Sequence, residues 1–195
     1  MYKFIQTAAF SALLLFGLAS QSAAQSAAGS WQGFRVGLTG NSEMSGEARA
    51  YNGGLLTNQA DTMGDQGAGA FIGYDTQRGN MVYGVELQAL KRDNAIVGFP
   101  NSVFENIRSV RGRVGYANNN VLLLGSLGFA SSNFNDTGTN FSQDGIVVGI
   151  GAEVMMTPRT FVGLGIDHYK LSGSNGAAKI EGDHTLFQIR AGMKF

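Results

Sequence analysis

Cysteine, proline and long apolar runs are scarce or absent in this chain of 195 residues. Because it has no Cys, thiolate metal sites, cysteine nucleophiles and a disulfide scaffold are excluded. Beyond the N-terminal region no apolar run reaches the roughly 20 residues that a membrane-spanning helix needs, which excludes a multi-pass helical membrane protein. Only two Pro but 29 Gly are present, and the chain has the length of one domain.

Charge is also sparse, and neither sign dominates. The chain has 14 basic and 14 acidic residues, for a formal net charge of zero. No run or stripe of Lys and Arg occurs, and phosphate backbones require a concentrated positive surface. Nucleic acid is therefore not expected as a partner.

The N-terminus has the features of a secretory signal. Lys3 is followed by an apolar core over residues 8–19 and by small residues up to Ala24. We therefore expect residues 1–24 to be a cleaved signal peptide and residues 25–195 to form an exported domain.

The last eleven residues alternate apolar and polar side chains. With a period of two, Ile189 lies on one face, and Arg190 and Lys194 lie on the other. The pattern recurs about eight times along the chain, with Val85 and Val148 on equivalent apolar faces. It predicts strands at about 31–40, 67–77, 81–91, 105–117, 121–131, 143–156, 160–171 and 185–195.

The expected connections alternate between tight turns and long loops. The long ones cover about 41–66, 92–104, 132–142 and 172–182. An antiparallel meander with this alternation has all its long loops at one end, as in transmembrane barrels with short periplasmic turns. Because backbone groups in lipid must be satisfied internally, the sheet must close. The fold class predicted is all-β, an eight-stranded antiparallel up-and-down transmembrane β-barrel.

The polar faces of the strands carry almost every strand charge. Eight strands leave an interior only wide enough for side chains, and buried ions are tolerated when they are paired. We therefore expect an ion network that closes the lumen, with inward glycines leaving room for long side chains. Its predicted members are Arg35, Asp75, Glu86, Arg111, Arg113, Glu153, Asp167, Arg190 and Lys194.

Aromatic side chains are expected in two belts at the membrane interfaces. Trp31, Tyr116 and Phe195 fall near the tight-turn end, and Phe129 and His168 fall toward the loop end.

Several phrases, among them Ser109-Val-Arg-Gly-Arg-Val-Gly-Tyr116 and the ending from Arg190 to Phe195, resemble the small outer-membrane β-barrel family. This family includes the Omp25/Omp31-like surface proteins of α-proteobacteria and, more remotely, the barrel domain of OmpA. The resemblance implies a Gram-negative outer-membrane location, a role in envelope structure and in some members host contact. It also implies that Phe195 is an assembly signal read by the outer-membrane assembly machinery.

Catalysis and cofactor binding find little support in the sequence. The only histidines are His168 and His184, and Ser172 and Ser174 lie near them in the chain without the His-x-Ser pattern of barrel deacylases. A Ser-His-acid site needs nucleophile and base within hydrogen-bond reach, and two separate His make a poor metal site. We expect no enzyme activity, no metal and no cofactor.

The remaining candidates are apolar residues in the expected polar loops, since exposed apolar groups can mark contact sites. Three hypotheses follow: a structural surface barrel that contacts outer-membrane lipids and lipopolysaccharide and has adhesive loops for a host or surface ligand, a narrow porin-like channel, and a soluble exported ligand-binding barrel. The loop candidates are Tyr51, Leu55, Leu56, Phe99, Phe134 and Phe141.

Overall fold

The structure of the chain is a computed structural model. It describes residues 30–62, 66–96, 99–136 and 139–195; within these, only the backbone is described for 93–96, 99–105, 134–136 and 139–141. The predicted signal peptide lies outside the described residues. No helix in the described part of the chain is long and apolar enough to cross a membrane.

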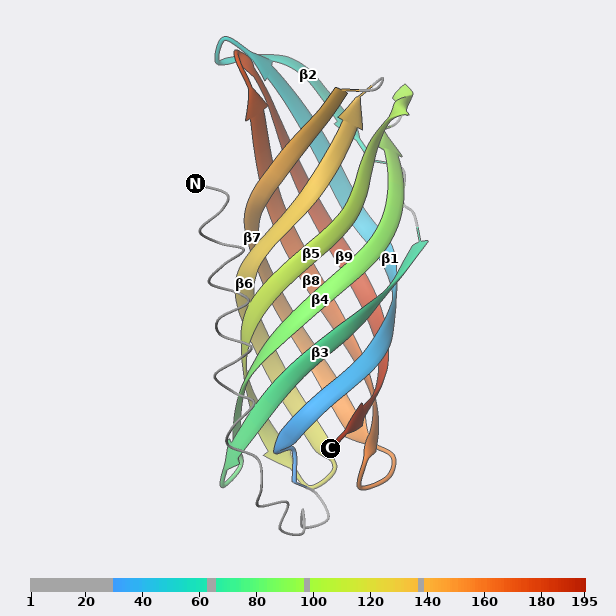
Figure 1. Cartoon of the computed structure of the whole chain (residues 1–195), viewed down its shortest axis with the longest axis vertical. Helices are drawn as coiled ribbons and strands as arrows, with labels where there is room; N and C mark the ends of the chain where they lie inside the picture. Colours follow the sequence, from blue (N-terminus) through green and yellow to red (C-terminus); the bar gives the residue numbers. More distant parts are fainter. Residues whose placement is uncertain (1–29, 63–65, 97–98, 137–138) are drawn as a thin grey trace.

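The described residues form one antiparallel sheet that closes on itself (Figure 1). Eight long strands run up and down in chain order, and a short strand, β2, continues the line of β3. The strands are β1 (Gly33–Asn52), β2 (Leu55–Asp61), β3 (Gln66–Arg78), β4 (Met81–Ile96), β5 (Phe99–Asn118), β6 (Val121–Asp136), β7 (Thr139–Met155), β8 (Thr160–Asn175) and β9 (Ala178–Lys194).

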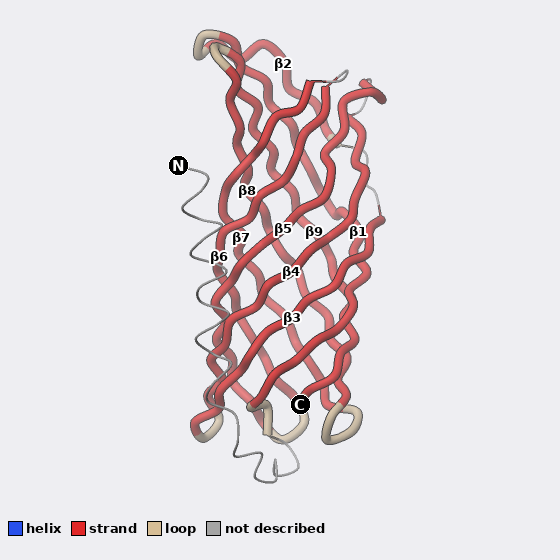
Figure 2. The backbone as a smooth tube through the Cα atoms, in the orientation of Figure 1, coloured by secondary structure: helices blue, strands red, loops and turns tan. Residues whose placement is uncertain are grey.

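Closure comes from pairing of the first strand with the last, which places Arg35 opposite Lys194. The strands tilt steeply around the axis (Figure 2). We followed the paired residues from strand to strand around the barrel, starting at Arg35 on β1 and passing through Glu86 and Arg111. The path returns to β1 at Gly46, which lies further along the strand than Arg35. This stagger is what a closed barrel of tilted strands requires, and the predicted fold class is confirmed.

The two faces of each strand are those that the alternation predicts. Val85, Val148 and Ile189 are about half exposed, at 50%, 46% and 58%, on the outer wall. Arg111 and Glu153, at 3% and 1%, are buried inside. Apolar side chains therefore cover the outside of the barrel and ionic ones fill its interior.

The outer wall carries a continuous apolar belt. On β5 it runs from Tyr116 through Val114 to Val110, and the next outward residue is Arg108. On β6 it runs from Val121 to Phe129, followed by Ser131. Strand segments of this length, tilted at about 45°, match the roughly 25 Å apolar band of outer-membrane barrels.

The prediction of long loops at one end is wrong. β1 continues to Asn52, turns at Gly53 and Gly54, which both have positive φ, and returns as β2. The other three expected loops are likewise taken up mostly by extensions of the strands beyond the belt. Beyond the belt the outward face of a strand meets water and the buried face also carries polar side chains such as Arg92 and His184, so the apolar alternation that identifies a strand weakens while the ladder of hydrogen bonds continues.

β2 differs from the other strands because it pairs, within the described residues, with one strand only. That strand is β1, along its upper part. The edge of β2 that faces away from β1 is thus a free sheet edge in the part of the chain that the structure describes.

Candidate functional site

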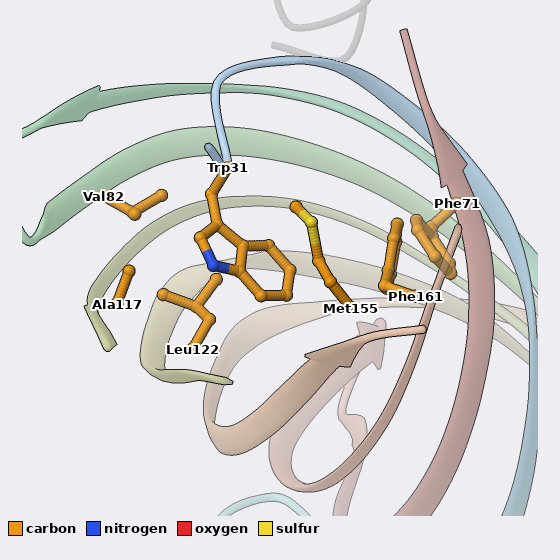
Figure 3. Close-up of a cluster of buried hydrophobic side chains, with 7 residues drawn as sticks. All are labelled: Trp31, Phe71, Val82, Ala117, Leu122, Met155 and Phe161. Carbon is orange, nitrogen blue, oxygen red and sulfur yellow. The ribbon is translucent and has the colours of Figure 1, made fainter. Parts of the chain in front are cut away.

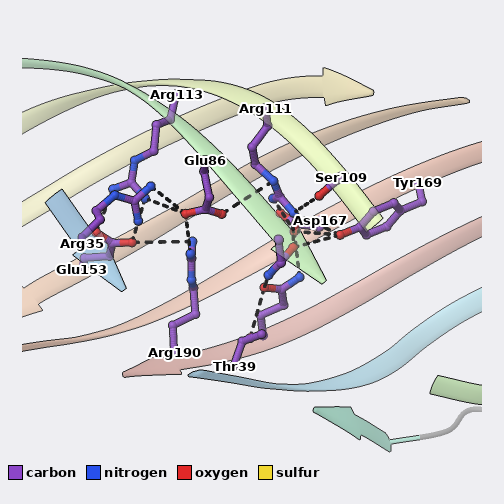
Figure 4. Close-up of polar contacts among 12 residues, drawn as sticks. Arg35, Thr39, Glu86, Ser109, Arg111, Arg113, Glu153, Asp167, Tyr169 and Arg190 are labelled. Carbon is purple, nitrogen blue, oxygen red and sulfur yellow. Dashed lines mark hydrogen bonds and ion pairs between the residues drawn. The ribbon is translucent and has the colours of Figure 1, made fainter. Parts of the chain in front are cut away.

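The centre of the lumen is organised around one carboxylate, that of Glu86 on β4. Arg190 lies 2.5 Å from Glu86 Oε2, Arg35 lies 2.6 Å from it and Arg113 lies 3.3 Å from it. Arg111 approaches the other oxygen at 3.7 Å. Figure 4 shows these four guanidinium groups converging on Glu86 from β1, β5 and β9. Glu86 therefore links strands that are distant in the chain.

Two further acids complete the lower part of the network. Glu153 receives a bidentate contact from Arg113, with Nη1 at 3.1 Å and Nη2 at 2.8 Å. Asp75 lies 3.0 Å from Arg35 and 3.4 Å from Arg113. Bidentate Arg–carboxylate pairs combine strength with fixed geometry, so these contacts hold β1, β3, β5 and β7 in one arrangement.

The upper part of the network is built around Arg111 and Asp167, whose Nη1 and Oδ2 are 2.6 Å apart. Gln188 donates to the same Asp167 oxygen at 2.7 Å, and the Tyr169 hydroxyl accepts from Arg111 at 3.1 Å. Gln88 accepts from Arg111 and donates to Gln188 at 3.0 Å. The alternation predicts that Gln88 and Gln188 point inward, but their place in the network was not predicted.

Eight of the nine predicted network residues meet in the lumen. Their four cations and four anions give a core with no net charge, which limits the cost of burying ions. They are Arg35, Asp75, Glu86, Arg111, Arg113, Glu153, Asp167 and Arg190.

Inward glycines leave the space that these side chains occupy, as predicted. A Cβ at Gly84 would overlap the carboxylate of Asp75, and a Cβ at Gly149 would overlap that of Asp167. Because interiors are close-packed, residues with side chains at these positions would displace members of the network.

Lys194 is the exception, and its predicted membership is wrong. Its side chain is buried, but it donates to the backbone carbonyl of Ser30. The reason is position: Lys194 is the last residue of β9 and lies where the segment before β1 crosses the mouth of the barrel.

The prediction that Trp31 belongs to an aromatic belt is also wrong, because its side chain points into the lumen and not toward lipid. Its backbone N–H donates to Gln77 at 2.7 Å, and its ring packs edge-on against Phe161 with the centroids 6.2 Å apart. Figure 3 shows the indole between Leu122 on one side and Met155 on the other. The apolar layer that it completes comprises Trp31, Phe71, Val82, Ala117, Leu122, Met155 and Phe161.

This lower apolar layer contacts the ionic layer directly. The Phe71 ring lies 4.0 Å from the guanidinium carbon of Arg190 and 5.5 Å from that of Arg35. Such cation–π contacts are strongest where water is excluded. The ring thus covers the lower side of the network.

A second apolar layer covers the network on its external side. Above it, the His184 Nδ1 lies 2.7 Å from Glu43, and Arg92 reaches from β4 to 3.7 Å from the same carboxylate. Sequence reasoning missed this upper ionic cluster because Glu43 and Arg92 fall in stretches that resemble loops. The upper apolar layer comprises Leu90, Ile107, Ala130, Val147, Tyr169, Leu171 and Leu186.

One small cavity lies within the network. A cavity of about 20 Å³, lined by Ser126, Gly151 and Gly165 together with network side chains, lies beside Asp167. This volume is about that needed for one water molecule. A larger hollow of about 640 Å³ opens among Val114, Ile150 and Phe187, whose outward orientation places it on the lipid side of the wall.

The residues predicted as loop contacts lie in different environments. Leu55 and Leu56 are exposed at 75% and 52% beside the tip of the β1–β2 hairpin. Tyr51 is half-buried, with its hydroxyl 3.4 Å from Glu181. The side chains of Phe99, Phe134 and Phe141 lie outside the described residues.

The two histidines lie apart in the structure. His168 is on the outer wall, with Nδ1 3.1 Å from the Thr185 hydroxyl, whereas His184 is inside the barrel. Among the residues that the structure describes, no cluster of three or more His, Asp or Glu side chains could hold a metal ion.

These features define a class of protein: a closed transmembrane β-barrel with an ion-paired lumen between two apolar layers. Comparison with known proteins agrees. Residues 10–195 match the family of outer membrane protein beta-barrel domains, and the chain belongs to this family. It is a bacterial outer-membrane protein.

The chain is similar to the 22 kDa outer membrane protein of Rhizobium leguminosarum bv. viciae, with 35% identity over 146 residues. The match covers 71% of this chain and 63% of that relative. Among solved structures it is similar in fold to OprG from Pseudomonas aeruginosa, with a TM-score of 0.52 and 13% identity, covering 84% of this chain and 96% of OprG. The outer-membrane location excludes the soluble exported barrel.

The network makes a prediction about stability. Changing Glu86 to Leu leaves four guanidinium groups without their shared carboxylate, and we expect a loss of about 3–5 kcal/mol in the free energy of unfolding. The matched control is Glu181→Leu, which breaks an exposed pair with Lys179 and should cost less than about 1 kcal/mol. Urea unfolding in detergent micelles measures both. Equal, small effects of the two changes would contradict a structural role for the network.

Proposed function

We propose that this protein is a structural, surface-exposed component of the outer membrane with a closed lumen, which contributes to envelope integrity and carries out no catalysis. The observation that supports this most directly is the stacking of an apolar layer, a neutral ionic layer and a second apolar layer inside one narrow barrel. The side chains that make up each layer are buried. A solute would have to break several buried ion pairs to pass, at a cost of several kcal/mol each.

We infer that its partners are outer-membrane lipids, lipopolysaccharide and the outer-membrane assembly machinery. The apolar belt supports the first two. For the third, Phe195 is 67% exposed, and its N–H donates to the carbonyl of Phe34 at 2.8 Å. The exposed side chain of Phe195 is accessible as an assembly signal.

The closed lumen predicts the electrical behaviour of the protein. In planar lipid bilayers we expect purified wild-type protein to give no sustained conductance. Replacing Trp31 by Gly together with Glu86 by Gln, which removes the indole across the mouth and the central carboxylate, should produce discrete openings. Sustained conductance of the wild-type protein would refute the closed lumen and favour the narrow porin-like channel.

Adhesion is a second candidate function, favoured by the exposed tip of the β1–β2 hairpin. Leu55 and Leu56 are large apolar side chains on the external end, next to a sheet edge that has no partner strand among the described residues. Exposed apolar groups and free edges both invite contact with another surface.

The adhesive role predicts a selective loss of surface binding. Cells that carry the Leu55→Ser and Leu56→Ser changes together should bind host cells or matrix less than cells with wild-type protein, at equal amounts of folded barrel. The control is Leu127→Ala, which removes an apolar side chain from the lipid-facing wall. Unchanged binding by the double variant would rule out the hairpin tip as an adhesive site.

A further inference from the structure

The lower part of the ion network, around Glu86, and the upper part, around Arg111, face each other across a gap that is slightly too wide for a hydrogen bond. Glu86 Oε1 and Arg111 Nε are 3.7 Å apart. Both atoms are buried, and neither has a hydrogen-bond partner among the residues that the structure describes. Two polar atoms more than about 3.5 Å apart are commonly joined by a bridging water molecule.

The small cavity beside Asp167 lies at this gap. Its volume is about 20 Å³, and Glu86, Arg111 and Arg190 all line it. Arg190 Nε is likewise buried without a hydrogen-bond partner in the described part of the chain. Ser126, whose hydroxyl can donate or accept, lines the same space. A cavity of about 10–15 Å³ or more can hold one water molecule when about two to four polar groups bind it, and this cavity meets both conditions.

Gly165 on β8 preserves this space. A Cβ built at Gly165 would meet only backbone atoms, the Ile150 carbonyl oxygen at 3.1 Å and the Gly151 Cα at 3.8 Å. At Gly84 and Gly149, by contrast, a Cβ would overlap carboxylates of the network. Glycine at position 165 therefore does not make room for another side chain, and the space that it leaves adjoins the cavity.

The charge of the network favours a neutral occupant. Four cations and four anions make up the network, so the surroundings of the cavity have no net charge. An ion would add an uncompensated charge to this buried cluster. A water molecule can accept a hydrogen bond from a guanidinium and donate one to a carboxylate at the same time.

We propose that the lumen contains a binding site for one ordered water molecule, which accepts a hydrogen bond from Arg111 Nε and donates one to Glu86 Oε1, with Ser126 as its third partner. This goes beyond the proposed structural role, because it assigns a ligand to the cavity and joins the lower and upper parts of the network through it. A single water molecule opens no path through the barrel, since an apolar layer lies on each side of the network.

The direct test is a crystal structure of the mature wild-type protein at a resolution that shows ordered water. We expect one water peak in the cavity, about 2.7–3.2 Å from both Glu86 Oε1 and Arg111 Nε. An empty cavity would overturn the proposal. So would an Arg111 side chain that closes the gap and donates directly to Glu86 Oε1.

The variant Gly165→Ala tests what the water contributes to stability, because its methyl group takes up the space of the cavity. Displacing the water leaves the two facing atoms unpaired, and we expect the equilibrium constant for unfolding in urea to rise about tenfold. The matched control is Gly112→Ala on the lipid-facing wall, where the nearest atom to an added Cβ is the Leu127 carbonyl oxygen at 3.9 Å. It should change the constant less than about threefold.

The two variants also separate a bound water from an empty void. In a dry cavity the added methyl fills the void, and Gly165→Ala would be at least as stable as Gly112→Ala; that result would overturn the proposal. Crystal structures of both variants should show the water peak lost in Gly165→Ala and kept in Gly112→Ala. A peak that persists in Gly165→Ala would count against the site. Bilayer conductance of the same preparations tests the closed lumen separately.

Discussion

Burial of ions inside a narrow barrel whose interior is lined by side chains is the constraint on which this structure depends. Charges in such an interior are tolerated only when each has a partner. Four arginines and four acids meet this condition by sharing contacts, with Glu86 touched by Arg35, Arg113 and Arg190 at 3.3 Å or less. Because the partners come from seven of the nine strands, the network links most of the wall.

The apolar layers above and below the network reinforce it. Trp31 and Phe161 at the periplasmic mouth, and Leu171 and Leu186 on the external side, belong to apolar clusters on either side of the ions. Exclusion of water strengthens each ion pair and also makes an unpaired charge more costly. A barrel with these buried layers is suited to the proposed structural role in the outer membrane, and its outer wall and strand extensions are the surfaces left for contacts.

The strands within the membrane and the direction of their side chains could be predicted from the sequence alone. A period of two is enough to assign Val85 and Glu86, and likewise Val148 and Gly149, to opposite faces of their strands. The sequence did not predict which charged side chains contact one another. Contacts such as Arg190 to Glu86 depend on the stagger of the closed barrel, which no single strand encodes. Trp31 precedes the first strand, so the alternation says nothing of its direction. Glu43 and Arg92 lie on strand extensions beyond the apolar belt, where the outward face meets water and the buried face also carries polar groups, so these stretches show no apolar periodicity.

The most direct measurement of the central claim is a double-mutant cycle on the bidentate pair of Arg113 and Glu153, using Arg113→Met, Glu153→Leu and both together. If the buried network determines stability, each single change leaves a charge without its partner. The loss of unfolding free energy in the double variant is then smaller than the sum of the losses in the two single variants. We expect a coupling free energy of about 1–3 kcal/mol from urea unfolding. Strictly additive effects would show that these ions do not act as a unit, and would contradict the account.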